Sequence, residues 1–146
     1  MTNGAAWGVL VLRIVLGVIL VMHGSMVFTT YTPSGMASLV TRIGYPPWSA
    51  LILAWYLILV HVAGGVLIVI GLWTRLAAVL NLPIMLSAVL MLHLSQGFFM
   101  RGVVADGRTS AVGYEFSLLV LACTIAIALI GAGPFSIDGR RPARRR

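Results

Sequence analysis

Long apolar stretches alternate with shorter polar segments along the 146 residues. Four of them, residues 7–28, 50–73, 76–94 and 112–130, approach the roughly 20 helical residues that cross a hydrocarbon core about 30 Å thick. Apolar residues run through them without the alternation that membrane β-barrel strands show. The pattern therefore predicts an all-α fold, a transmembrane four-helix bundle that forms one membrane domain over residues 1–138.

The segments between these stretches indicate how the spans are connected. Residues 29–49 and 95–111 are polar and contain glycine or proline, so we expect two long loops there. The link around Thr74-Arg75 is very short, and the second and third spans should therefore be antiparallel neighbours. Because the number of spans is even, both termini and this short link are predicted at the same end of the bundle.

Arginine is distributed unequally between the two predicted ends. The end with the termini carries the short link and a basic tail at residues 139–146. The positive-inside rule then predicts cytoplasmic N- and C-termini and external long loops. The arginines of the terminal end are Arg75, Arg140, Arg141, Arg144, Arg145 and Arg146, and those of the other end are Arg42, Arg101 and Arg108.

The composition agrees with a membrane setting. Hydrophobic residues make up 60% of the chain, charged residues 9%, and the mean hydropathy is +1.06. The formal charge of +7 comes largely from the tail, which is expected to attract anionic lipid headgroups. No basic face interleaved with aromatic residues accompanies it, so we expect the lipid bilayer, and no nucleic acid, as a partner.

Five ionisable side chains lie inside the predicted spans, where each costs roughly 2.5–3.5 kcal/mol to insert. Counted along the helices, His23, His93 and Glu115 lie near the external ends of three different spans. His61 lies near the middle of the remaining span, on the same helix face as the glycines at 64 and 65, and should point into the bundle. These four side chains are predicted to meet inside the protein.

Arg13 is the fifth of these groups and lies about two turns from the cytoplasmic end of the first span. An arginine at that depth can extend its guanidinium to the membrane surface, and we expect Arg13 to do so in preference to finding a buried partner.

Glycines mark the places where helices can approach one another closely. They are Gly17 and Gly24 on the first span and Gly64, Gly65 and Gly71 on the second. Small residues allow van der Waals contact between helices in lipid, so we interpret these glycines as packing positions.

The polar cluster is open to several interpretations. Histidine and glutamate can exchange protons with a quinone headgroup, with His93 and Glu115 as candidate catalytic groups and His23 and His61 completing a ligand-binding lining. The same side-chain types bind transition metals or haem, with His23, His93 and Glu115 as candidate ligands. They could also line a site for another amphipathic ligand, or hydrogen-bond one another and only hold the bundle together.

Several short motifs follow one another along most of the chain, from residue 12 to residue 138. They are Leu12-Arg13 followed by His23-Gly24, Gly64-Gly65 with Gly71 and Thr74-Arg75, His93 with Gly97-Phe98-Phe99, Gly113-Tyr114-Glu115-Phe116, and Ser136-Ile137-Asp138. In the order and spacing of these motifs, the sequence resembles the DoxX family of small four-helix membrane proteins. It departs from the usual family pattern at two positions, with His61 in place of an acidic residue and Val27 in place of a lysine.

The resemblance implies a redox setting in the inner membrane of a bacterium. The leading hypothesis is a membrane subunit of an oxidoreductase system, linked to quinone or to thiol and oxidative-stress electron transfer, whose cofactor is a quinone. Such a chain would be catalytic only as part of a quinone-dependent oxidoreductase complex, with other redox subunits or a homo-oligomer as partners. The alternatives are a non-enzymatic scaffold or assembly factor that recruits redox proteins, and a metal-binding protein or small-solute carrier.

Overall fold

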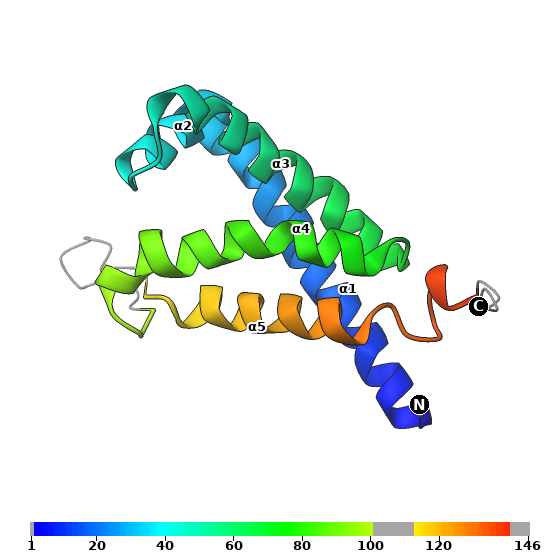
Figure 1. The fold of residues 1–146 in the computed structure, drawn as a ribbon. Coiled ribbons are helices and arrows are strands. Elements are labelled where there is room, and N and C mark those ends of the chain that lie inside the picture. Colours follow the sequence, from blue (N-terminus) through cyan, green and yellow to red (C-terminus); the bar gives the residue numbers. More distant parts are fainter. Residues whose placement is uncertain (1, 101–112, 141–146) are drawn as a thin grey trace.

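The computed structural model describes residues 2–100 and 113–140, and these residues form helices and turns without a β-strand (Figure 1). Five α-helices account for most of them, with π-helical turns continuing two of the helices. The elements in order are α1 (Asn3–Met26), a π-helical turn (Val27–Tyr31), α2 (Thr32–Arg42), α3 (Pro47–Ile70), α4 (Thr74–Ser87), a second π-helical turn (Ala88–His93), a 3₁₀ turn (Leu94–Gln96), α5 (Glu115–Ile130) and a 3₁₀ turn (Asp138–Arg140).

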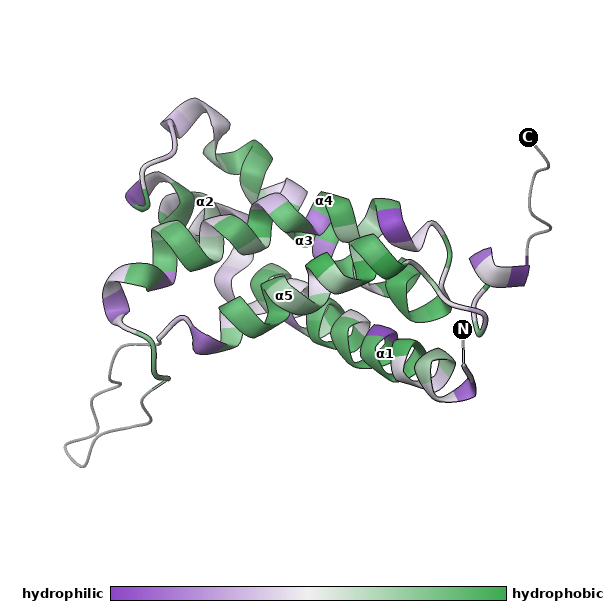
Figure 2. Cartoon of the chain, turned by 60° about the horizontal axis from the view of Figure 1, so that its bottom comes forward, coloured by the Kyte–Doolittle hydropathy of each residue, from purple (hydrophilic) through white to green (hydrophobic). Residues whose placement is uncertain are grey.

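Three helical stretches in the described residues are long and apolar enough to cross a membrane: Asn3–Arg42, Pro47–Ile70 and Thr74–Gln96. The fourth, Glu115–Ile130, is apolar but shorter. Figure 2 shows hydrophobic residues along most of the helices, with hydrophilic ones mainly near their ends. The chain is therefore a helical membrane protein, as its hydropathy predicts. Residue 112, where the fourth predicted span begins, lies outside the described residues.

The helices pack as two crossing pairs. α1 packs against α3 and α4 against α5, and α3 also contacts α4 beyond the short turn between them. Figure 1 shows that the pairs converge near the α3–α4 turn and diverge toward α2. The predicted neighbour relation of the second and third spans is confirmed, and the described start of α1 and the described segment after α5 lie at the same end of the bundle as this turn.

Glycines allow the backbones of α1 and α3 to come into direct contact where the two helices cross. A Cβ added to Gly17 would lie 2.6 Å from the carbonyl oxygen of Gly65, and one added to Gly65 would lie 2.7 Å from that of Gly17. Both distances are too short for real atoms, so any side chain at either position would separate the helices. The interpretation of these glycines as packing positions is confirmed.

The first long connection contains a helix, and its prediction as a loop at residues 29–49 was wrong. α2 begins at Thr32, whose Oγ1 accepts a hydrogen bond of 3.2 Å from the backbone N–H of Gly35, and Pro33 occupies the first turn. Met36 and Val40 are four residues apart and buried in one hydrophobic cluster with Ala54 of α3. The segment is helical because it covers an apolar face of α3.

The prediction that Arg13 extends to the membrane surface was also wrong. Arg13 is only 1% exposed, and its guanidinium donates to backbone carbonyl oxygens at the end of α3 and in the segment after α5. The acceptors are Ile68 at 2.8 Å, Val69 at 2.9 Å, Phe135 at 3.1 Å and Ala132. The C-terminal segment folds back over α1, and its carbonyl groups provide the buried partner that the sequence did not show.

Candidate functional site

A cavity of about 390 Å³ lies between the two helix pairs, beside α2. Its lining combines side chains from all five helices and from both π-helical turns. Most of the lining is apolar, and all three histidines of the chain contribute to it. The structure thus brings together His23, His61 and His93, which the sequence analysis placed on three different spans. The polar and aromatic members of the lining are His23, Tyr31, Tyr45, Tyr56, His61, Ser87, His93, Phe116 and Ser117.

His61 forms the buried end of this site, and His23 lies against it. The two ring centroids are 5.6 Å apart and the planes are tilted by 47°. His61 is 2% exposed, whereas His23 is exposed. A Cβ at Gly24 would lie only 2.8 Å from the Cβ of His61, so the glycine lets α1 approach the α3 turn that carries the ring. Because His23 is exposed and His61 is buried, a ligand entering the cavity would contact His23 before His61.

His93 closes the second π-helical turn, Ala88–His93, which continues α4. Its side chain lines the cavity together with that of His23. π-helical turns within α-helices are rare and often occur at functional sites, because they re-aim side chains relative to a regular helix. Here the turn accompanies the third histidine of the cavity.

Glu115 does not line the cavity, although its neighbours Phe116 and Ser117 do. Its carboxylate Oε1 accepts a hydrogen bond of 2.8 Å from the backbone N–H of Met100. The backbone N–H of Glu115 donates to the carbonyl oxygen of Phe98 at 3.0 Å. Glu115 thus joins the start of α5 to the chain that follows the 3₁₀ turn at residues 94–96. Its proposed catalytic and ligand-binding roles stay predictions, and the geometry described here does not support them.

The described residues hold no group of three or more His, Cys, Asp or Glu side chains arranged to bind a metal ion. The predicted metal ligands His23, His93 and Glu115 therefore do not form such a group in the described structure, and Glu115 instead accepts a hydrogen bond from the Met100 backbone. Cys123 packs beside the apolar core instead of lining the cavity.

Several polar side chains near the cavity were missed by the sequence analysis. Tyr45 lies between α2 and α3, and its hydroxyl pairs with that of Ser87 at 2.8 Å. Tyr56 on α3 donates from its hydroxyl to the carbonyl oxygen of Leu80 at 2.7 Å. Asn81 is fully buried in the middle of α4, directly across from α3. An asparagine in the middle of an apolar span needs a polar partner inside the protein. Its presence within residues 76–94 could therefore have identified Asn81 as a candidate site residue.

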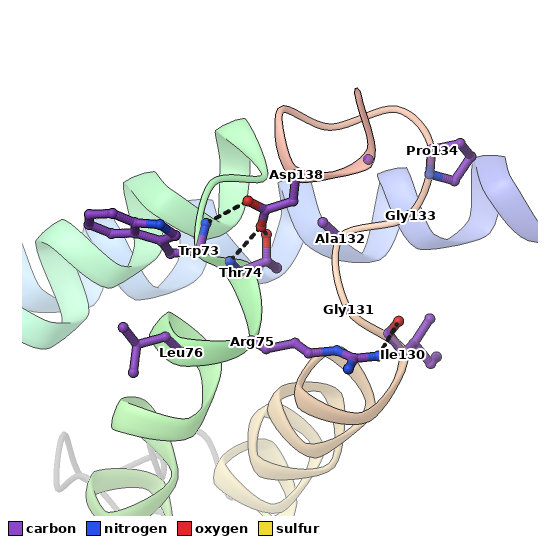
Figure 3. Close-up of a pocket in the computed structure, with 11 residues that line it drawn as sticks. Trp73, Thr74, Arg75, Leu76, Ile130, Gly131, Ala132, Gly133, Pro134 and Asp138 are labelled. Atoms are coloured by element: carbon purple, nitrogen blue, oxygen red, sulfur yellow. Dashed lines mark hydrogen bonds between the residues drawn. The ribbon is translucent and has the colours of Figure 1, made fainter. Parts of the chain in front are cut away.

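A second hollow, of about 570 Å³, lies at the terminal end between the α3–α4 turn and the segment after α5 (Figure 3). Its charged side chains form hydrogen bonds with the backbone of the same protein. Asp138 accepts hydrogen bonds from the N–H groups of Trp73 and Thr74, and Arg75 donates to the carbonyl oxygens of Leu129 and Ile130. These contacts cap the start of α4 and the end of α5, so we assign the polar groups of this hollow a structural role at the end of the bundle.

The histidine cavity therefore has the chemistry of a site for an amphipathic ligand. Its walls suit an apolar tail or ring, and its imidazoles can donate or accept hydrogen bonds and carry protons. Among the described residues, it is the place where ionisable side chains from three spans meet.

A model of the DoxX family matches residues 8–94, which include the three histidines but not α5. A protein of Bacillus subtilis (strain 168) described as "Putative oxidoreductase CatD" is 29% identical over 131 residues, covering 90% of this chain and 84% of that protein. No solved structure matches the chain.

Proposed function

Because the chain belongs to the DoxX family, we propose that it is a membrane subunit of an oxidoreductase system and that its histidine-lined cavity binds the headgroup of a quinone or quinol. The observation that carries the proposal is the meeting of three histidines from separate membrane helices in one otherwise apolar cavity. The similarity to a protein described as an oxidoreductase supports the redox setting.

The cavity suits the two parts of a membrane quinone. A quinone ring has two oxygens that need hydrogen-bond partners, and its isoprenoid tail needs apolar surroundings. His23, His61 and His93 provide imidazole nitrogens for hydrogen bonds to these oxygens, with His61 at the buried end of the cavity. Apolar side chains from all five helices supply most of the rest of the lining.

The role proposed for this chain is binding the headgroup and passing protons. Interconversion of a quinone and a quinol transfers two protons and two electrons. The histidines can exchange the protons, because imidazole titrates in the neutral range. The two electrons are exchanged with a redox protein that associates with this subunit.

The orientation in the membrane is part of the same proposal. With cytoplasmic termini and the positive-inside distribution of arginine, the cavity lies toward the external half of a bacterial inner membrane. Reporter fusions to the C-terminus test this orientation, because alkaline phosphatase is active only outside the cytoplasm and a fluorescent protein folds inside it.

Direct binding tests the proposed ligand. Purified full-length protein in lipid nanodiscs is titrated with decylubiquinone and with decylubiquinol, and heat of binding is recorded. His23→Ala should weaken binding about tenfold if one hydrogen bond to the headgroup is lost. Met22→Ala is the matched control, since Met22 precedes His23 and is exposed on α1 outside the cavity.

Failure of both quinone forms to bind the wild-type protein would contradict the proposal. Co-purification of a stoichiometric redox protein in that case would favour the scaffold alternative.

A further inference from the structure

Two buried polar atoms, one on His61 of the cavity lining and one on Asn81 of the adjoining helix, have no hydrogen-bond partner within the described structure. They are Nδ1 of His61 and Oδ1 of Asn81. The two residues are on adjoining helices, with His61 2% exposed and Asn81 fully buried. A buried polar atom without a partner destabilises the fold, and one hydrogen bond between the two side chains would satisfy both atoms.

The Asn81 side chain is fixed in one orientation by its amide nitrogen. Nδ2 donates to the carbonyl oxygen of Ala77 at 2.8 Å and to that of Val60 at 3.3 Å. Both N–H donors are used, so Oδ1 faces another way and can only accept. Since Val60 precedes His61, the amide lies against the α3 turn that carries the ring.

The neutral imidazole of His61 has two possible tautomers. One nitrogen carries the proton and donates, and the other has a lone pair and accepts. An Nδ1–H group complements the acceptor Oδ1 of Asn81, directly or through one water, whereas an unprotonated Nδ1 would place two acceptors together. Only the Nδ1–H tautomer satisfies both buried atoms.

Two glycines hold this pair in place. A Cβ at Gly64 would lie 2.8 Å from Nδ2 of Asn81, and a Cβ at Gly24 would lie 2.8 Å from the Cβ of His61. His61 is thus held between α1 and α4. The Asn81 amide occupies space that is free only because residue 64 is a glycine.

We propose that Asn81 is a positioning residue that holds His61 as the Nδ1–H tautomer, so that Nε2 presents a lone pair to the cavity and selects the hydroxyl-bearing quinol over the quinone. This inference rests on the proposed quinone function. A quinol hydroxyl donates to the Nε2 lone pair. A quinone carbonyl oxygen has only lone pairs and meets that nitrogen unfavourably.

The first test compares affinities for decylubiquinol and decylubiquinone in full-length protein in nanodiscs. The wild type should prefer the quinol, and Asn81→Leu should lower that preference about fivefold to tenfold. Gly64→Ala displaces the amide from the opposite side and should reduce the preference.

The second test observes the tautomer and needs only the wild-type fold. ¹⁵N chemical shifts of the His61 ring, assigned by the signals lost in His61→Gln, show which nitrogen carries the proton. We expect Nδ1 to be protonated and Nε2 to carry the lone pair in the wild type.

The outcomes separate the two claims. Equal affinity for both forms, an unchanged preference in Asn81→Leu, or a proton on Nε2 would overturn this inference and leave the proposed function standing. Binding of neither form would overturn the proposed function itself. A variant that fails to fold leaves the wild-type spectrum and the wild-type preference to decide.

Discussion

Nε of Arg13 on α1 donates a hydrogen bond of 2.8 Å to the carbonyl oxygen of Ile68, two residues before the end of α3. The same guanidinium reaches the carbonyl oxygens of Val69, Ala132 and Phe135. One side chain therefore connects the first helix, the end of the third and the C-terminal segment. Guanidinium suits this place because its donors diverge in a plane and keep their charge.

Replacing Arg13 should destabilise the protein strongly. Arg13→Met keeps a long apolar chain but leaves four carbonyl oxygens, in two buried and two part-buried contacts, without their charged donor, and we expect a loss of about 2–4 kcal/mol in unfolding free energy. The measurement is thermal unfolding in detergent, followed by size-exclusion chromatography of the heated protein.

Arg42→Met is the control for Arg13→Met, because Arg42 is exposed at the end of α2. Equal melting temperatures for the two variants would contradict the role assigned to Arg13.

Gly65→Ala should weaken the crossing of α1 and α3. The new methyl group would lie 2.7 Å from the Gly17 carbonyl oxygen, a backbone atom that moves only with its helix. We expect a loss of about 1–3 kcal/mol from overpacking. Gly8→Ala is the matched control on α1, since a Cβ there meets nothing within 4 Å. Unfolding in detergent should show no loss for Gly8→Ala, and a similar loss in both variants would disprove the close crossing.

The histidine cavity could be predicted from the sequence in part. The cost of a polar side chain in hydrocarbon indicates that His23, His61 and His93 turn inward, and counting residues along each span gives their depths. Those two arguments do not predict which way a side chain points when its residue is at the end of a helix. Glu115 has a suitable depth, yet it is in the first turn of α5 and bonds to the Met100 backbone.

Other features could not be deduced from span counting. The buried partners of Arg13 are carbonyl groups of residues 132 and 135, and their positions depend on the return of the chain after α5. α2 did leave a signal in Thr32-Pro33, which has the form of a helix N-terminus, with a capping hydroxyl and a proline at the start. Polar composition concealed it, because only Met36 and Val40 form its buried face.

Asp138→Ala should loosen the α3–α4 turn. Oδ1 accepts from the N–H of Trp73 at 3.1 Å, and Oδ2 accepts from the N–H and the hydroxyl of Thr74 at 3.0 and 3.2 Å. Loss of this cap at the start of α4 should cost about 1–2 kcal/mol in unfolding measurements. Thr2→Ala removes the more weakly bonded cap of α1, an exposed contact of 3.4 Å, and should change stability far less. A larger effect of Thr2→Ala would contradict this account.

Glu115→Gln separates the structural role of this residue from a role at the cavity. The carboxylate accepts from the Met100 N–H at 2.8 Å, and Glu115 is absent from the cavity lining. The amide oxygen of glutamine can still accept but lacks the charge that strengthens the bond, so we expect a stability loss of about 1 kcal/mol or less. Affinity for decylubiquinone in nanodiscs should stay within twofold of the wild type, while His23→Ala weakens it about tenfold. A Glu115→Gln variant that binds as poorly as His23→Ala would place the carboxylate in the site after all, because the retained hydrogen-bonding shape leaves only the lost charge to explain the weaker binding.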